Sequence, residues 1–219
     1  MADGRFVNVS QSPRDFKKPV VVFVEGLDEV NVIGSIAESL GLVVDVWHVG
    51  GKEKLATQFP LAVKQATFEV VKAFGIIQDA DNNPGGTFAS IKNLLEKHAL
   101  PAPKVPGEMV KDGGRSAGVL VLPGNGRNGY LEDLFLDANE GTGHLLCARA
   151  FATCCEGVGS KTFSSKDLAY SLLVALGTPE PRLGRAFQSK AVNADSVAYT
   201  ELKEFLTRLS EVGAQARVP

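Results

Sequence analysis

The sequence lacks an excess of positive charge. It contains 23 Lys and Arg residues against 25 Asp and Glu residues, which gives a formal net charge of −2. Proteins that bind bare nucleic acid over a broad surface usually carry clustered Lys and Arg. Any contact with phosphate must therefore come from a local basic patch, from a bound metal ion or from a partner.

Cysteine is also scarce. The chain has Cys147, Cys154 and Cys155, an odd number confined to one short stretch, whereas secreted disulfide frameworks use an even number spread along the chain. We therefore expect reduced thiols in the core of a cytoplasmic protein. His144 lies three residues before Cys147 and raises the alternative of a zinc site, but the apolar neighbours favour a buried helix.

Long apolar runs are missing as well. No run approaches the roughly 20 apolar residues that a membrane-spanning helix needs. The first residues, which are polar, contain no apolar segment of the kind found in a signal peptide. We expect no membrane association.

Short apolar runs rich in β-branched residues predict four strands, which alternate with helical patterns. Such runs are typical of central parallel strands that are covered on both faces. The strands are expected at 19–24, 42–47, 70–78 and 118–123, and the helices at 28–40, 52–59, 61–69, 87–99, 130–139, 143–156, 165–176 and 197–212, with Pro60 breaking the pattern between two of them. The order predicts an α/β fold of the Rossmann kind, with a mostly parallel four-stranded sheet and C-terminal helices packed on it.

The chain shows no linker that would divide it. Residues 1–18 are polar and are expected to be flexible, residues 19–213 to form a single domain, and residues 214–219 to form a tail. The glycine pair in Gly50-Gly51-Lys52 is interpreted as a strand-to-helix turn.

Acidic residues follow three of the four predicted strands. Glu25 ends the first, Asp79 and Asp81 end the third, and Glu132 and Asp133 open the helix after the fourth. Active sites of parallel sheets form beyond the carboxyl ends of the strands, so these side chains are expected at one edge. Crowded carboxylates repel one another, and a hard divalent cation such as Mg²⁺ relieves that repulsion.

Four of the aspartates in and near these positions also have a structural interpretation. Asp79 and Asp81 precede Asn82-Asn83-Pro84-Gly85, a strongly turn-forming stretch. Asp28 can cap a helix or join the metal shell. Asp133 is better explained by the dipole at a helix start than as a ligand.

Several motifs together resemble a known superfamily. Val24-Glu25-Gly26-Leu27-Asp28, followed by Asp79-Ala80-Asp81, resembles the signature of the Toprim domain, which topoisomerases, bacterial primases, small RNase maturases and overcoming-lysogenization-defect (OLD) nucleases share. Within that superfamily the chain is similar to small standalone proteins of the DUF3226 type over about residues 19–206. The segments that carry this similarity are Leu122-Pro123-Gly124-Asn125-Gly126, Leu131-Glu132-Asp133-Leu134 and Leu183-Gly184-Arg185-Ala186-Phe187.

The resemblance implies a role for each matching residue. Glu25 corresponds to a metal ligand or proton-transfer group, Asp79 and Asp81 to metal ligands, and Glu132 to the carboxylate that completes the site. A basic catalytic residue is implied near Lys166, with Lys161 as the alternative. The implied cofactor is Mg²⁺ or Mn²⁺, and the implied catalytic residues are Glu25, Asp79 and Lys166.

Contacts with substrate phosphate are expected from basic side chains outside the acidic residues. The segment from Gly124 to Gly129 fits G-x-G-x-x-G, but no further strand with a terminal acid follows, so a dinucleotide cofactor is disfavoured. The candidates for phosphate contacts are Arg127, Arg185 and Lys161.

The sequence therefore predicts a Mg²⁺- or Mn²⁺-dependent nuclease that acts on DNA or RNA. The alternative is a latent regulatory or binding subunit that works with an ATPase, because the chain contains no G-x-x-x-x-G-K-[ST] loop of its own. A small-molecule phosphatase ranks third, since the nucleophilic aspartate motif of the common class is missing. No motif fixes the oligomeric state or the choice between DNA and RNA.

Overall fold

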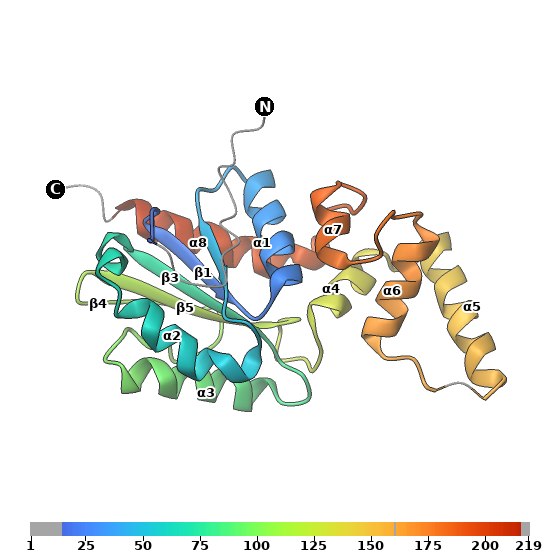
Figure 1. The fold of residues 1–219 in the computed structure, drawn as a ribbon, viewed down its shortest axis with the longest axis horizontal. Helices are drawn as coiled ribbons and strands as arrows, with labels where there is room; N and C mark the ends of the chain where they lie inside the picture. Colours follow the sequence, from blue (N-terminus) through green and yellow to red (C-terminus); the bar gives the residue numbers. More distant parts are fainter. Residues whose placement is uncertain (1–14, 160, 216–219) are drawn as a thin grey trace.

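The computed structural model describes residues 15–159 and 161–215. Its centre is a five-stranded sheet in the order β2-β1-β3-β5-β4 (Figure 1). The strands are β1 (Val20–Val24), β2 (Asp45–His48), β3 (Ala73–Asp79), β4 (Met109–Asp112) and β5 (Arg115–Leu122). Four of them run parallel, and β4 pairs antiparallel with β5. The predicted α/β fold with a mostly parallel sheet is confirmed.

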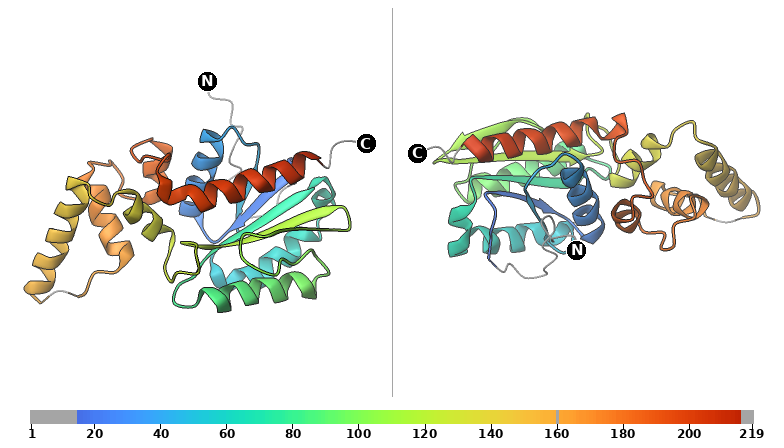
Figure 2. Two further views of the ribbon diagram at one scale, coloured as in Figure 1. Left: turned by 180° about the vertical axis from the view of Figure 1, so that it is seen from behind. Right: turned by 90° about the horizontal axis from the view of Figure 1, so that it is seen from above.

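Both faces of the sheet are buried, which explains the continuous apolar runs. Because successive side chains point to opposite faces, Val20, Val22 and Val24 lie in one core while Val21 and Phe23 lie in the other. The first core is covered by α1 (Leu27–Ser39) and α8 (Thr200–Gln215), and the second by α2 (Leu55–Val63) and α3 (Pro84–Lys97) (Figures 1 and 2).

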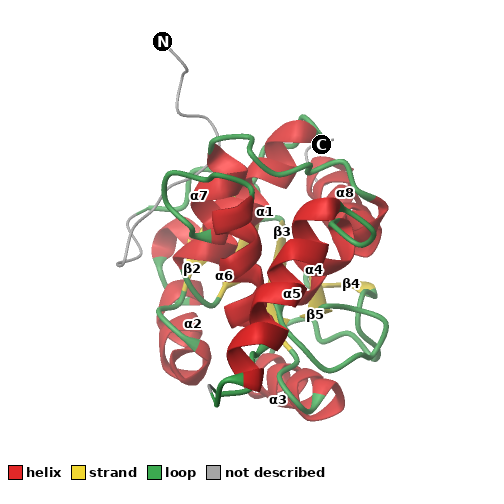
Figure 3. Cartoon of the chain, turned by 90° about the vertical axis from the view of Figure 1, so that its right-hand side faces the viewer, coloured by secondary structure: helices red, strands yellow, loops and turns green. Residues whose placement is uncertain are grey.

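The remaining helices extend beyond the carboxyl edge of the sheet. They are α4 (Leu131–Ala138), α5 (Gly143–Gly157), α6 (Ser165–Ala175) and α7 (Leu183–Gln188). We call them the helical projection; Figure 3 views the molecule from its end. Of the C-terminal helices, α8 packs on the sheet, α7 packs on α1, and α5 and α6 pack on each other.

The strand β4 was not predicted. It has four residues, its side chains are partly or fully exposed, and Gly113 and Gly114 connect it to β5. This short edge strand buries only part of Met109 and Val110, so it leaves no alternating pattern in the sequence. The helix α7 was missed for a similar reason, because six residues are too few to establish a helical period.

Two helix boundaries differ from the prediction. Pro60 lies inside α2 instead of ending a helix. A proline inside a helix costs about 3 kcal/mol, but full burial of a side chain such as Leu55 or Phe59 contributes about 1.5–3 kcal/mol each, which offsets that cost. The helix α3 begins earlier than expected, because Asn83 accepts a hydrogen bond from the Gly86 amide and Pro84 occupies the first helical position.

The prediction of core thiols is wrong. Cys147 and Cys154 are exposed, Cys155 is half-buried, and all three are free. Because α5 lies in the projection, it buries only the stripe formed by Leu145, Ala148 and Ala152. Within the described ranges, no helix combines the length and apolarity required to cross a membrane.

The predicted flexible segment 1–18 falls mainly on residues 1–14, which lie outside the described residues. The Phe16 side chain is buried and stacks on Trp47 with the ring centroids 4.2 Å apart, and the Phe16 amide donates a hydrogen bond to Thr67 Oγ1. The packed part of the chain thus begins before residue 19. Of the predicted tail, 214–215 belong to α8, and 216–219 lie outside the described residues.

Candidate active site

The carboxyl ends of β1 and β3 place two predicted acids side by side. The Asp79 amide donates a hydrogen bond to Glu25 Oε1 at 3.3 Å, and Asp79 Oδ1 accepts one from the Leu131 amide at 3.0 Å. The Asp79 side chain therefore joins the end of β3 to the first turn of α4. With only 5% of its surface exposed, Asp79 is the most enclosed of the predicted site residues.

The electrostatic environment of Asp79 is that of a crowded carboxylate. Burial, followed by the negative charges of Glu29, Glu25 and Glu132, raises the pKa of Asp79 to about 8. Burial also raises the pKa values of Glu25, Glu29 and Glu132. We call these four side chains the carboxylate cluster; their raised pKa values mean that the protein alone does not fully stabilise their charged forms.

Glu29 was not predicted to belong to the site. It lies in the first turn of α1, and its Oε2 accepts a hydrogen bond from the Gly26 amide at 3.0 Å. A glutamate at this position normally completes a helix cap, so the sequence pattern has a sufficient structural explanation. Only its proximity to the end of β3, which follows from the fold, brings it near Asp79.

The structure separates the two lysines that the sequence left as alternatives. Lys166 opens α6, and its Nζ lies 4.6 Å from the centre of the Tyr130 ring. Burial opposes its charged form, but the surrounding acidic groups, of which Glu132 and Asp79 contribute most, together outweigh burial and raise the pKa of Lys166. Lys161 instead forms an exposed ion pair with Asp167 at 2.8 Å. Lys166 therefore lies near the carboxylate cluster, and Lys161 does not interact with it.

Asp81 occupies a different position from the other predicted ligands. It adopts a left-handed backbone conformation with φ of 52°, and its amide and carbonyl exchange hydrogen bonds with Gly129. Its carboxylate is partly exposed and forms an ion pair with Lys52. Lys52 also was not predicted, because a lysine after two glycines has an ordinary explanation as part of a turn.

The three predicted phosphate contacts are engaged elsewhere. Arg127 forms an ion pair with Asp137 of α4 at 2.8 Å, and the Arg185 guanidinium lies 3.5 Å from the carboxylate of Glu180. As with Lys161, these side chains are exposed and paired with acids of the same chain. The structure does not bring them together with the carboxylate cluster.

The structural interpretation of Asp133 is confirmed. Its Oδ2 accepts a hydrogen bond from the Tyr130 amide at 2.7 Å, and its Oδ1 accepts one from Ser165 Oγ at 2.6 Å. Asp133 thus caps α4 and links it to the start of α6, where Lys166 lies. Asp28 is not the cap of α1, which is Gly26, and its Oδ1 accepts a hydrogen bond from the Gly184 amide at 3.3 Å.

Comparison with known proteins places the chain in a family. The sequence profile of the family described as "Protein of unknown function (DUF3226)" matches residues 19–211. The chain belongs to this family. The expected DUF3226 resemblance is therefore confirmed, and the wider Toprim assignment stays a prediction. No protein with curated annotation matches the chain.

Solved structures of other proteins are similar in fold to this chain. Two structures of the C-terminal region of the Xanthomonas campestris pv. campestris OLD protein, phased with platinum and with mercury, match with 16% and 15% identity. They cover 90% and 93% of this chain and 95% and 100% of theirs, each with a TM-score of 0.50. The C-terminal region of the Burkholderia pseudomallei OLD protein matches with 18% identity, 88% and 98% coverage and a TM-score of 0.49. At 15% and 16% identity, the likeness to the two Xanthomonas structures concerns the fold alone.

The donor set of this DUF3226 protein fits a divalent cation that takes few protein ligands. Over residues 15–159 and 161–215, no group of three or more His, Cys, Asp or Glu side chains is arranged to hold a metal ion by itself. Mg²⁺, however, is commonly held by one or two carboxylates, with water and substrate phosphates completing its shell. Glu25, Asp79 and Glu132 offer carboxylate oxygens as ligands, and a bound cation would lower their raised pKa values.

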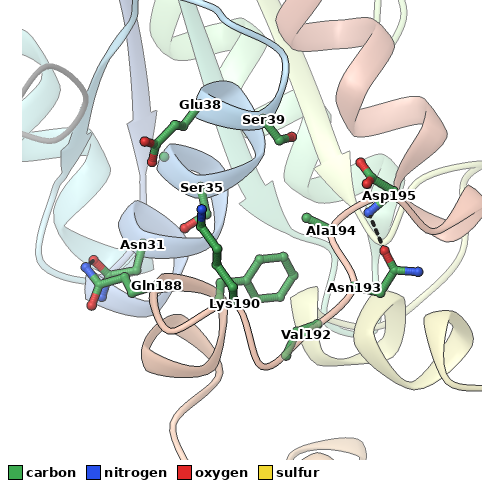
Figure 4. A pocket seen from close by; sticks show the side chains of 12 residues that line it. Asn31, Ser35, Glu38, Ser39, Gln188, Lys190, Val192, Asn193, Ala194 and Asp195 are labelled. Carbon is green, nitrogen blue, oxygen red and sulfur yellow. Dashed lines mark hydrogen bonds between the residues drawn. The ribbon is translucent and has the colours of Figure 1, made fainter. Parts of the chain in front are cut away.

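A separate cavity lies away from the carboxylate cluster. It has a volume of about 690 Å³ and lies between α1 and the segment that follows α7 (Figure 4). Ser35, Glu38, Lys190 and Asn193 are among its lining residues. None of the four clustered carboxylates lines it, so it is distinct from the candidate active site.

Proposed function

We propose that this protein is a Mg²⁺- or Mn²⁺-dependent phosphodiesterase of the Toprim type, which cleaves nucleic acid. The observation that carries the proposal is the environment of Asp79. The ionised form of a buried carboxylate that has three others and one lysine near it is poorly stabilised without a cation. Such a carboxylate is well suited to bind one.

Each residue of the site has a distinct task in this proposal. One or two of the carboxylates of Glu25, Asp79 and Glu132 would hold the cation, with water and substrate phosphate completing its shell, and the bound cation would neutralise charge on a scissile phosphate. Lys166 of α6 would contact a phosphate oxygen and stabilise the negative charge that develops during the reaction. Glu25 accepts a proton in a pH range closer to neutrality than an ordinary glutamate, because burial raises its pKa.

Cleavage assays on plasmid DNA and on RNA test this function. With Mn²⁺ present, the wild-type protein is expected to cut at least one of them. Glu25→Gln, Asp79→Asn and Lys166→Met should each lower the rate by about 10²-fold or more, because each removes a charge that acts on the phosphate or on the cation. Asp112→Asn, on the exposed edge strand β4, is the matched control and should keep the wild-type rate.

The proposal fails if cleavage persists in Asp79→Asn. Such a result would assign the activity to a contaminant or to a site elsewhere on the chain. If Lys166→Met retains cleavage, the role proposed for that lysine is wrong, but the rest of the proposal stands.

A second candidate is a subunit that is inactive alone and works with an ATPase. It is favoured by the pairing of Arg127, Arg185 and Lys161 with acids of the same chain, which leaves them poorly placed to hold a nucleic-acid backbone. A partner would then bind the nucleic-acid substrate. Cleavage by the isolated chain would contradict this candidate, and cleavage only after addition of a copurified ATPase would support it.

A further inference from the structure

Lys52 is fixed to the candidate active site by the backbone that precedes it. The amides of Gly50 and Gly51 both donate hydrogen bonds to the carbonyl oxygen of Glu25, at 3.0 and 2.8 Å. Gly50 has φ of 86° and Gly51 has φ of 122°, conformations that glycine adopts without strain. The glycine pair therefore sets the start of the Lys52 side chain directly beside the end of β1.

The ammonium group of Lys52 contacts three groups around the end of β3, in the strand, in the turn after it and in α3. Its Nζ donates hydrogen bonds to the Asp79 carbonyl oxygen at 3.0 Å and to Thr87 Oγ1 at 3.2 Å, and it forms the ion pair with Asp81. Its positive charge also opposes the increase in the pKa of Glu25. One positive charge thus already lies among the groups that are proposed to attract a cation.

We propose that Lys52 is an internal counter-ion at the end of β3, whose positive charge opposes binding of the divalent cation and whose ion pair with Asp81 keeps that additional carboxylate from the cation. The inference rests on the proposed function, since it concerns the same cation. In the structure the Asp81 carboxylate is occupied by the ammonium group, so a cation must either displace Lys52 or bind against its repulsion. Lys52 is thereby a positioning residue, which holds Asp81 in place while the cation is absent.

The surroundings of Lys52 allow such a displacement. The Lys52 side chain is 35% exposed. Lys52 and Asp81 both line a hollow of about 460 Å³ that opens beside the start of α3. The ammonium group can leave Asp81 and remain solvated, because its long flexible stem reaches this hollow.

Calorimetric titration with Mn²⁺ tests the competition. Lys52→Met removes the charge and keeps the length of the stem, and it should bind Mn²⁺ about two- to fivefold more tightly than the wild type, the range that an exposed ion pair sets. Lys54→Met, two residues further along the same turn, should keep the wild-type affinity. Lys52→Arg retains the positive charge and should also bind like the wild type.

A double variant assigns the effect to the ion pair. In an Asp81→Asn background, Lys52→Met should change the affinity for Mn²⁺ by less than it does in the wild type, because the partner of the lysine is already neutral. An equal gain in both backgrounds would overturn the pairing with Asp81. Weaker binding by Lys52→Met, or identical behaviour of Lys52→Met and Lys52→Arg, would overturn the competition.

The outcome also separates this inference from the proposed function. If the wild type and Lys52→Met bind Mn²⁺ equally well, the role of Lys52 is overturned and the proposed function stands. If no variant binds Mn²⁺, the proposed function and the role of Lys52 fall together.

Discussion

At the scale of single residues, folding places the Asp79 carboxyl group where its ionised form is unfavourable. Its amide and side chain are held by Glu25 and by the Leu131 amide, so it cannot turn away from the other carboxylates. Its pKa of about 8 means that, without a cation, it is mostly protonated at neutral pH. A residue of this kind is typical of a site that is completed by a ligand.

This pKa has a consequence for stability. The folded state binds the proton of Asp79 more tightly than the unfolded state, so stability is lost as the pH rises from about 4, where the unfolded carboxyl titrates, to about 8. The metal-free protein should lose up to about 1.4 kcal/mol of unfolding free energy per pH unit in this range. Asp79→Asn keeps the oxygen that accepts the Leu131 hydrogen bond and removes the titration.

Denaturant unfolding between pH 5 and pH 8, with a chelator present, measures the effect. We expect a falling stability for the wild type and for the exposed control Asp112→Asn, and a flatter profile for Asp79→Asn. Parallel profiles for all three proteins would show that Asp79 does not titrate in this range.

At the scale of elements, the contact between α8 and the sheet depends on two glycines. Gly75 of β3 and Gly118 of β5 are direct neighbours in the sheet register, and together they form a flat patch beneath the buried ring of Phe205. A Cβ added to Gly75 would meet Leu209 Cδ2 at 2.9 Å and the Phe205 ring at 3.0 Å. The helix can approach the sheet this closely only because both positions lack a side chain.

Gly75→Ala should therefore destabilise the protein. Overpacking of this kind costs about 1–3 kcal/mol, because Phe205 and Leu209 must shift in a fully packed core. Gly157→Ala is a suitable control, since a Cβ there meets no atom within 4 Å and alanine is favoured over glycine in a helix. Thermal unfolding of the two variants should give a lower midpoint for Gly75→Ala only; equal midpoints would show that α8 does not press on this patch.

The sequence predicted the elements whose patterns depend on burial. The four parallel strands were found because both of their faces are covered. The proximity of Glu25, Asp79 and Glu132 was expected because they lie at the ends of two parallel strands and at the start of the helix after a third, while their role in a site stays a prediction. The strand β4 and the path of α2 through Pro60 were not predicted, since neither an exposed edge nor a helix held by packing leaves a periodic signal. Glu29 and Lys52 were missed because each has a complete local explanation, as a helix cap and as part of a glycine turn.

At the scale of the whole molecule, two parts of the fold combine to form the candidate active site. The sheet and α1 supply Glu25, Glu29 and Asp79, while the helical projection supplies Glu132 from α4 and Lys166 from α6 (Figure 1). The hydrogen bond from Ser165 Oγ to Asp133 fixes the start of α6, where Lys166 lies, against α4. The sequence alone could not decide between Lys166 and Lys161, because this contact joins helices that are separated by α5.

The central claim is that the carboxylate cluster binds a divalent cation in exchange for a proton. Titration calorimetry with Mn²⁺ at pH 7, carried out in two buffers of different ionisation enthalpy, measures both the binding and the proton release. We predict that the wild type binds Mn²⁺ and releases about one proton, because Asp79 with its pKa of about 8 must ionise, and that Asp79→Asn releases none. Binding without proton release, or no binding by the wild type, would contradict the account.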